Sequence, residues 1–169
     1  MSRSSDDVDA KLTGNLSGGV QDPTISTNAD TSGTNFRFAA LTPLPGRSGQ
    51  APTATERPTV VNFWFATCEP CRREMPALSA AAGQWAGKVD FIGINPNDTA
   101  ESATAFLDRY AVTYPNYLDR TGEQLSLSGV GTMPTTFFLD ASGTIITMHA
   151  GELSEKDISA GIARILPGG

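Results

Sequence analysis

The sequence predicts an α/β domain in which a central mixed sheet is flanked by helices on both faces. Apolar, β-prone runs alternate with segments whose apolar residues recur at helical spacing, which is the pattern of layered α/β domains. With 169 residues, 39% of them hydrophobic, the chain is long enough for one such domain and a tail. No internal repeat is visible.

The first 35 residues differ in composition from the remainder. They are rich in Ser, Thr, Gly, Asn and Asp, and such a segment buries too little apolar surface to offset its ordering entropy. We therefore expect a flexible leader over residues 1–35 and a folded domain over residues 36–169. No stretch has the roughly 18 consecutive apolar residues of a membrane helix, and no signal-peptide apolar region is present.

Six segments have the apolar, β-prone pattern of strands. The most continuously apolar one is expected to be a buried central strand, because strands covered on both faces lack alternation. The last two predict an antiparallel hairpin across a turn that contains Gly143. In chain order the segments are residues 36–41, 59–65, 89–94, 114–118, 135–139 and 144–149.

Three segments have the periodicity of helices. The first covers residues 69–85, and Pro76 is expected to kink it. The second covers residues 99–110, with Asp98 and Glu101 predicted as its capping box. The third follows a predicted cap made by Ser154 and Asp157, and its apolar positions are Ile158, Ile162 and Ile165.

The two cysteines lie where the central strand stops and the first helix begins. Cys68 is placed at the helix N-terminus, where unpaired N–H groups and the helix dipole stabilise a thiolate. Cys71 follows one turn later, close enough to form a disulfide with Cys68. So short a loop gains little stability from a disulfide, which favours a redox site.

A zinc site lacks ligands, because there is no second Cys pair and His149 is the only histidine. We expect neither metal nor cofactor.

The residue types assign different tasks within the Cys-Glu-Pro-Cys turn. Cys68 is predicted to be the nucleophile, and Cys71 to resolve the mixed disulfide. Pro70 stiffens the turn and suits a first helical turn. The Glu69 carboxylate opposes thiolate formation, whereas the two arginines that follow Cys71 favour it.

Two blocks of the sequence, residues 60–76 and residues 130–145, resemble the TlpA/ResA/DsbE group of the thioredoxin superfamily. These are extracytoplasmic thiol–disulfide oxidoreductases of bacteria. The resemblance covers residues 36–166 and implies a thioredoxin-like fold with an inserted βα unit, residues 89–110, between the CxxC helix and the strand after Pro134. It also implies that Pro134 is cis and faces the CxxC, and that the backbone of Met133 pairs with the bound substrate.

The resemblance implies a function as well. Such a protein exchanges disulfides with protein substrates outside the cytoplasm. By analogy it keeps the cysteines of apocytochrome c reduced and is recharged by a membrane thiol–disulfide donor. The leader is then what remains after removal of a signal or anchor. We expect a monomer, and the net charge of −6 argues against nucleic acid as a partner.

Several alternatives stay open at this stage. The protein could be a disulfide-forming oxidase of secreted proteins, a non-enzymatic domain with a structural disulfide, or a cytoplasmic protein with a loose tail. A peroxiredoxin would carry a Pro-x-x-x-Thr/Ser-x-x-Cys pattern, and the residues before Cys68 lack that proline.

Three positions depart from the family pattern. The buried Asp that thioredoxins carry six residues before the first Cys is Asn62 here, which cannot titrate. Asp98, in the loop after the next strand, reads as a helix cap rather than as a proton relay. Thr67 stands where the family commonly has Trp, so Trp64 and Phe65 are the remaining candidates for an aromatic platform, with core packing as their default role.

Overall fold

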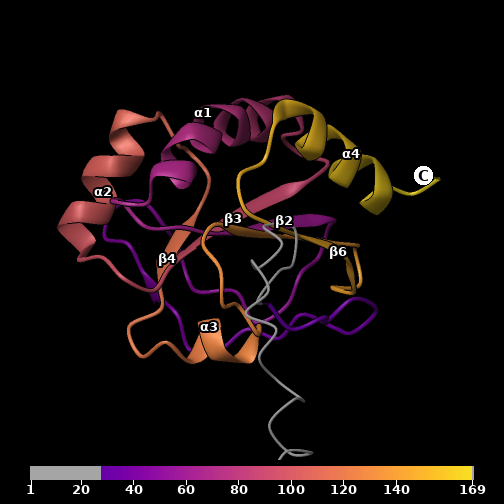
Figure 1. Cartoon of the computed structure of the whole chain (residues 1–169), viewed down its shortest axis with the longest axis horizontal. Helices are drawn as coiled ribbons and strands as arrows, with labels where there is room; N and C mark the ends of the chain where they lie inside the picture. The colour runs from indigo at the N-terminus through magenta and orange to yellow at the C-terminus, as the bar shows by residue number, and fades with distance from the viewer. Residues whose placement is uncertain (1–27, 169) are drawn as a thin grey trace, which may run out of the picture.

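The computed structural model describes residues 28–168, which form a six-stranded mixed sheet with four helices (Figure 1). The leader expected over residues 1–35 therefore lies mostly outside the described residues. The strands are β1 (Thr42–Pro43), β2 (Thr59–Phe63), β3 (Asp90–Asn95), β4 (Asn116–Leu118), β5 (Thr135–Leu139) and β6 (Ile145–Ala150). The helices are α1 (Glu69–Gln84), α2 (Ala100–Arg109), α3 (Glu123–Leu127) and α4 (Glu155–Ile165).

The strand order is β1-β4-β3-β2-β5-β6, which places β2 near the middle of the sheet. β2 runs parallel to β3 and antiparallel to β5, and β5 and β6 form the predicted antiparallel hairpin. In the β2–β5 pair, Phe63 at the end of β2 lies opposite Thr135 at the start of β5. The turn that follows β2 and the loop that precedes β5 are therefore at the same edge of the sheet.

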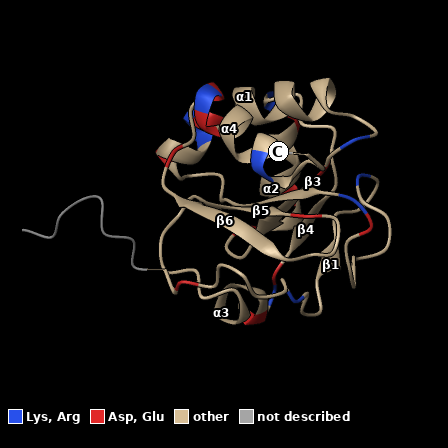
Figure 2. Ribbon diagram, turned by 90° about the vertical axis from the view of Figure 1, so that its right-hand side faces the viewer, with Lys and Arg blue, Asp and Glu red and all other residues tan. Residues whose placement is uncertain are grey.

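Helices cover both faces of the sheet, as the sequence predicts. Figure 2 shows α1, α2 and α4 on one side and α3 on the other. Alternate residues of the central strands point to these two layers. Val60 and Phe138 join the core under α1 and α4, whereas Val61 and Phe137 join the core on the opposite face. At Gly161 of α4 an added Cβ would come within 2.3 Å of the Phe138 ring, so α4 packs closely on β5.

Most predicted elements are present within a few residues of their expected bounds. α1 runs unbroken through Pro76, which lies on its exposed side. The Ser154–Asp157 capping box at the start of α4 is formed in both directions, and the three isoleucines of that helix are buried. The predicted strand over residues 114–118 is present as β4, and between β4 and β5 the structure adds the short helix α3, which the sequence did not reveal.

Two expectations about the N-terminal part were wrong. Residues 36–41 do not form a strand; Phe36 and Leu41 are buried in the core, but pairing occurs only just outside the segment, in the bridge from Asn35 to Thr144 and in β1 from Thr42 onward. Residues 28–35 were assigned to the leader, yet they are attached to the domain. Ala29 N–H donates to Gly129 O, and further backbone bonds join this segment to the β5–β6 hairpin. This polar segment buries little apolar surface, and it is attached to the domain by backbone and side-chain hydrogen bonds instead.

The predicted cap of α2 is also corrected. Thr99, not Asp98, is the N-cap residue, and its hydroxyl accepts from Ser102 N–H. Asp98 and Thr99 are both good caps by residue type, and the helix begins one residue later than the Asp98 assignment requires. Because the Asp98 carboxylate does not cap the helix, it can accept a hydrogen bond from Ala66 N–H, two residues before Cys68.

Candidate active site

The two cysteines form a disulfide across the first turn of α1. Cys68 is the N-cap residue, and its Sγ accepts from Cys71 N–H at 3.3 Å. Cys68 keeps 6% of its surface exposed and Cys71 none, so Cys68 is the member of the pair that a partner can reach. Pro70 occupies the first turn, where its missing N–H leaves no helical hydrogen bond unmade.

Charged side chains next to the disulfide pair with each other. The Glu69 carboxylate accepts from Arg72 Nη1 at 2.8 Å, so the carboxylate that was expected to oppose thiolate formation has a cation beside it. Arg72 Nε also donates to Ala66 O at 3.0 Å. The arginine therefore holds the turn before Cys68 to the helix after it.

The loop before β5 lies at the same edge of the sheet as the disulfide. The Met133–Pro134 peptide bond is cis. Met133 is half-buried and packs against the core cluster that contains both cysteines. Among residues 28–168, neither the N–H nor the C=O of Met133 has a hydrogen-bond partner. An open stretch of backbone therefore lies at the same edge of the sheet as the reachable cysteine.

A buried carboxyl group lies one helical turn after Cys71. Glu74 is 1% exposed, and its oxygens accept from Asn62 Nδ2 at 2.8 Å and from Leu153 N–H at 2.9 Å. Burial raises the pKa of Glu74 to about 7; the hydrogen bonds from Leu153 and Asn62 lower it, and the nearby Glu152 carboxylate raises it further. Asn62 also donates to Thr136 Oγ1 at 3.0 Å. A titratable group is therefore present behind the disulfide, although it comes from α1 and not from β2.

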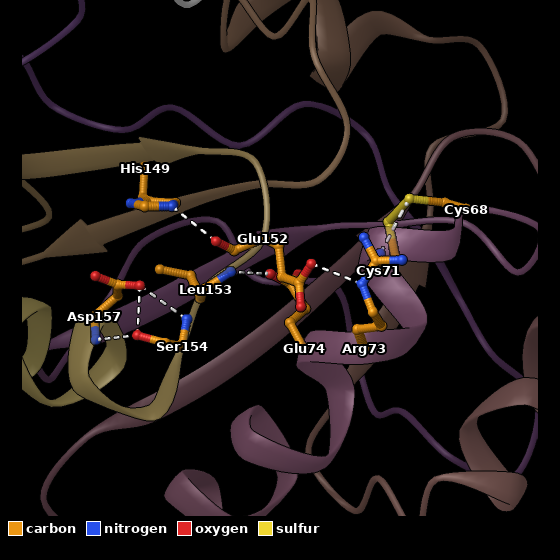
Figure 3. A network of polar contacts seen from close by, with 9 residues as sticks. All are labelled: Cys68, Cys71, Arg73, Glu74, His149, Glu152, Leu153, Ser154 and Asp157. Carbon is orange, nitrogen blue, oxygen red and sulfur yellow. Dashed lines mark hydrogen bonds and ion pairs between the residues drawn. A yellow bond between two sulfur atoms is a disulfide. The ribbon is translucent and has the colours of Figure 1, made fainter. Parts of the chain in front are cut away.

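The loop between β6 and α4 contacts the Glu74 carboxyl through the Leu153 N–H (Figure 3). Figure 3 shows Glu74 projecting from α1 toward the loop that carries Leu153, while Arg73 reaches Glu152 of the same loop. The Arg73 Nε to Glu152 Oε2 distance is 2.8 Å, and His149 Nε2 contacts Glu152 O at 3.1 Å. The network joins β6, the start of α4 and the second turn of α1.

A second carboxylate contacts the turn that leads into Cys68. Asp98 Oδ2 accepts from Ala66 N–H at 2.6 Å and from Asn95 Nδ2 at 2.7 Å. Ala66 is two residues before Cys68, so Asp98 fixes the turn that leads into the nucleophile. This contact corrects the assignment of Asp98 to the helix cap.

Of the site residues that the sequence singled out, Cys68, Glu69, Pro70 and Cys71 share the first turn of α1, and Met133, before the cis Pro134, packs against the core cluster that contains both cysteines. Sequence reasoning missed Glu74. The available signal was its position: with Cys71 and Leu78 it falls on the buried face of the helix, where a carboxyl group is out of place. Trp64 is fully buried and stacks on Phe106, so it belongs to the core and forms no aromatic platform.

Comparison with known proteins agrees with this geometry. The model of the AhpC/TSA family matches residues 40–148, which is more than half of the chain. The chain belongs to the AhpC/TSA family. Among individual relatives, the thioredoxin-like protein YneN of Bacillus subtilis is 31% identical over 122 residues, covering 70% of this chain and 71% of YneN. The thiol-disulfide oxidoreductase ResA of Geobacillus thermodenitrificans is 29% identical over 128 residues, covering 75% of this chain and 74% of ResA.

Solved structures place this AhpC/TSA chain in the thioredoxin-like fold. A secreted Mycobacterium tuberculosis disulfide oxidoreductase, described as homologous to E. coli DsbE, superposes with a TM-score of 0.65 at 26% identity, covering 73% of this chain and 92% of that one. A protein from Chlorobium tepidum described as a putative thiol:disulfide interchange protein DsbE gives 0.61 at 23% identity, over 77% and 99% of the two chains, and supports the fold alone. The chain is a thioredoxin-like thiol–disulfide oxidoreductase.

Metal-ligand clusters and membrane-spanning helices are both absent from the described residues. Within residues 28–168, no three His, Cys, Asp or Glu side chains gather as metal ligands would. Over the same residues, no helix combines the length and the apolar character needed to cross a bilayer.

Proposed function

We propose that this oxidoreductase is a reductase of protein disulfides outside the cytoplasm, of the kind that keeps the cysteines of apocytochrome c reduced. One observation carries the proposal: the reachable sulfur of Cys68 stands at a helix N-terminus, at the same edge of the sheet as the unpaired backbone of Met133. A disulfide-bearing chain could pair with this backbone and present its sulfur to Cys68. Pairing to a short open edge is a common way for proteins to hold extended peptides.

The reaction proceeds by two exchanges. The Cys68 thiolate attacks one sulfur of the substrate disulfide, forms a mixed disulfide and expels a substrate thiolate, which takes up a proton. The Cys71 thiolate then attacks Cys68 Sγ, breaks the mixed disulfide and expels the second substrate thiolate. Two electrons and two protons pass to the substrate, and the enzyme is left with the Cys68–Cys71 disulfide seen in the structure. A dithiol of a membrane donor returns the enzyme to its reduced form.

Glu74 fits the proton step that Cys71 requires. Cys71 has no exposed surface, so its proton must leave through the protein interior before it can attack. Glu74 lies one turn further along the same buried face of α1, and its pKa near 7 lets it hold or release a proton at neutral pH. It supplies the titratable group that Asn62 cannot.

The extracytoplasmic setting is part of the proposal. It is supported by the resemblance to ResA-like and DsbE-like proteins and by the M. tuberculosis relative, which is described as secreted. A monomeric state is also part of the proposal.

The decisive experiment is the reduction potential of the Cys68–Cys71 pair, measured by equilibration against dithiothreitol and glutathione buffers. A reductase is expected near the thioredoxin value of about −270 mV. A value near that of DsbA, about −120 mV, would favour the oxidase. If no buffer changes the redox state of the pair, the disulfide is structural and the proposal is wrong.

Single-cysteine variants test the assignment of the two thiols. Cys71→Ser should still attack a substrate disulfide and accumulate the mixed disulfide, because the resolving thiol is missing. Cys68→Ser should not react at all. The reverse pattern would make Cys71 the nucleophile.

A further inference from the structure

Asn28 makes an unusually complete set of contacts with the loop before Pro134. Its Oδ1 accepts from Gly131 N–H at 2.7 Å and from Thr132 N–H at 2.9 Å. Its Nδ2 donates to Thr135 Oγ1 at 2.7 Å. One side chain, more than 100 residues away in sequence, thus bonds residues on both sides of the Met133–Pro134 bond.

The contacts continue along the loop in both directions. Thr135 Oγ1 donates in turn to Thr132 O at 2.7 Å, which closes the loop on itself. On its far side, Pro134 O accepts from Gly151 N–H at 2.8 Å. Next to Asn28, Ala29 N–H donates to Gly129 O at 2.9 Å, and an added Cβ on Gly129 would lie 2.7 Å from the Ala29 Cβ. The segment therefore lies tightly against the start of the loop.

We propose that Asn28 is a positioning residue that holds the Met133 backbone in the orientation needed to pair with a protein substrate. Bonds to Asn28 fix the loop at Gly131, Thr132 and Thr135, and the bond from Gly151 fixes it at Pro134. Met133 lies between these points with its N–H and C=O unpaired within residues 28–168. An open backbone held at both ends needs no further ordering when a substrate chain pairs with it.

The inference rests on the proposed function, since it assigns Asn28 a role in presenting Met133 to protein disulfides. It goes beyond that function because Asn28 comes from the segment that the sequence assigned to a flexible leader. Asn28 touches neither cysteine in the described structure, so its effect must pass through the loop. Removing the Asn28 side chain should therefore lower the reaction rate with substrates that pair with the Met133 backbone and leave the rate with other substrates unchanged.

The test compares two disulfides on the full chain. The first is a disulfide-containing peptide long enough to pair with Met133, and the second is hydroxyethyl disulfide, which offers no backbone. In Asn28→Ala, the second-order rate with the peptide should fall about tenfold, equivalent to about 1.4 kcal/mol. The rate with hydroxyethyl disulfide and the reduction potential should stay at the wild-type values.

Two further variants separate positioning from stability. Asn35→Ala removes a side-chain contact of the same segment with Thr144, far along the sheet from Met133, and should leave both rates unchanged. Asn28→Asp keeps an oxygen to accept from Gly131 and Thr132 N–H and should retain most of the peptide rate. If Asn28→Ala fails to fold, Asn28→Ser, whose side chain is too short to reach all three partners, takes its place in the same comparison of the two disulfides.

Each outcome decides between the inference and the proposed function. If the rate of Asn28→Ala falls equally with both disulfides, or falls with neither, the positioning role of Asn28 is overturned. A wild-type protein that reduces hydroxyethyl disulfide but not the peptide contradicts the proposed function itself, whatever Asn28→Ala does. A selective peptide loss that Asn28→Asp restores supports the positioning role.

Discussion

Two carboxylates belong to the surroundings of the disulfide, one contacting the turn before Cys68 and one on the helix after Cys71, and their environments differ. Asp98 is half-buried and accepts from Ala66 N–H, in the turn before Cys68, and from Asn95. Glu74 is buried behind Cys71 and accepts from Asn62 and Leu153 N–H, with its pKa raised to about 7 by burial. The comparison teaches that two carboxylates with similar hydrogen bonds can have different roles, depending on their burial. Near solvent it fixes a turn, whereas in the interior it leaves a group able to titrate at neutral pH.

The largest expected effect comes from placing a second carboxyl beside each of these groups. Asn62→Asp would put one within hydrogen-bond distance of Glu74, where two buried charges cannot both form. A buried carboxyl of this kind typically has its pKa raised by about three, so the variant should lose roughly 4 kcal/mol of folding stability at pH 8 and much less at pH 5. Urea unfolding at the two pH values measures the difference.

Asn95→Asp is the matched control, since Asn95 bonds Asp98 as Asn62 bonds Glu74. Its loss should be smaller because Asp98 is partly open to solvent. Equal losses in the two variants would remove the distinction between the two carboxylates.

The next effect is the pH dependence that Glu74 gives to stability. The folded protein keeps this proton until a pH of about 7, whereas the unfolded chain releases it near 4.5. The contribution of Glu74 to folding stability should therefore be greatest below pH 4.5 and fall by roughly 3 kcal/mol as the pH rises through about 7, then stay level. Glu74→Gln should flatten this part of the profile, measured by urea unfolding across pH 4 to 8. An unchanged slope would show that the carboxyl titrates normally.

At the turn before Cys68, Asp98→Ala should cost about 2 kcal/mol, because Ala66 N–H and Asn95 Nδ2 lose a charged acceptor. Alkylation of the reduced protein should also change in rate at Cys68, since the turn before it loses a contact. A variant that alkylates like wild type would limit Asp98 to a structural role.

The smallest effect is expected at the Arg73–Glu152 ion pair. Its side chains are 58% and 39% exposed, and such pairs contribute about 0–1 kcal/mol. Arg73→Gln should therefore change stability by less than about 1 kcal/mol, and less still in high salt. Thermal melting at low and high salt checks this. A larger loss would mean that the ion pair holds the loop that carries Leu153.

Sequence reasoning succeeded where the signal was local. The strand–CxxC–helix unit, the β5–β6 hairpin and the Ser154 cap each depend on residues a few positions apart. It failed where the outcome depends on a distant partner. Residues 36–41 have the pattern of a strand, but apolar positions in an extended segment indicate burial and cannot show that a neighbouring strand is available.

The two carboxylates illustrate the same limit within the site. Asp98 precedes a helix and resembles a cap, and only the fold shows Ala66 and Asn95 within reach of it. Glu74 follows two arginines and reads as part of a charged run until its buried side of α1 is known. Asn28 carried no local signal at all, because every partner on the loop lies more than 100 residues away.

The strand order has a consequence for how the length of this chain can vary. The disulfide turn and the Pro134 loop meet because β2 and β5 are neighbours, with Phe63 opposite Thr135. Everything between them in sequence, from β3 through α3, lies beyond β2 or on the other face. Extra residues between the exposed Arg120 and Thr121 therefore extend a surface turn and leave the reacting groups in register. A single residue added within β5 would turn its inward side chains outward and separate the two halves of the site.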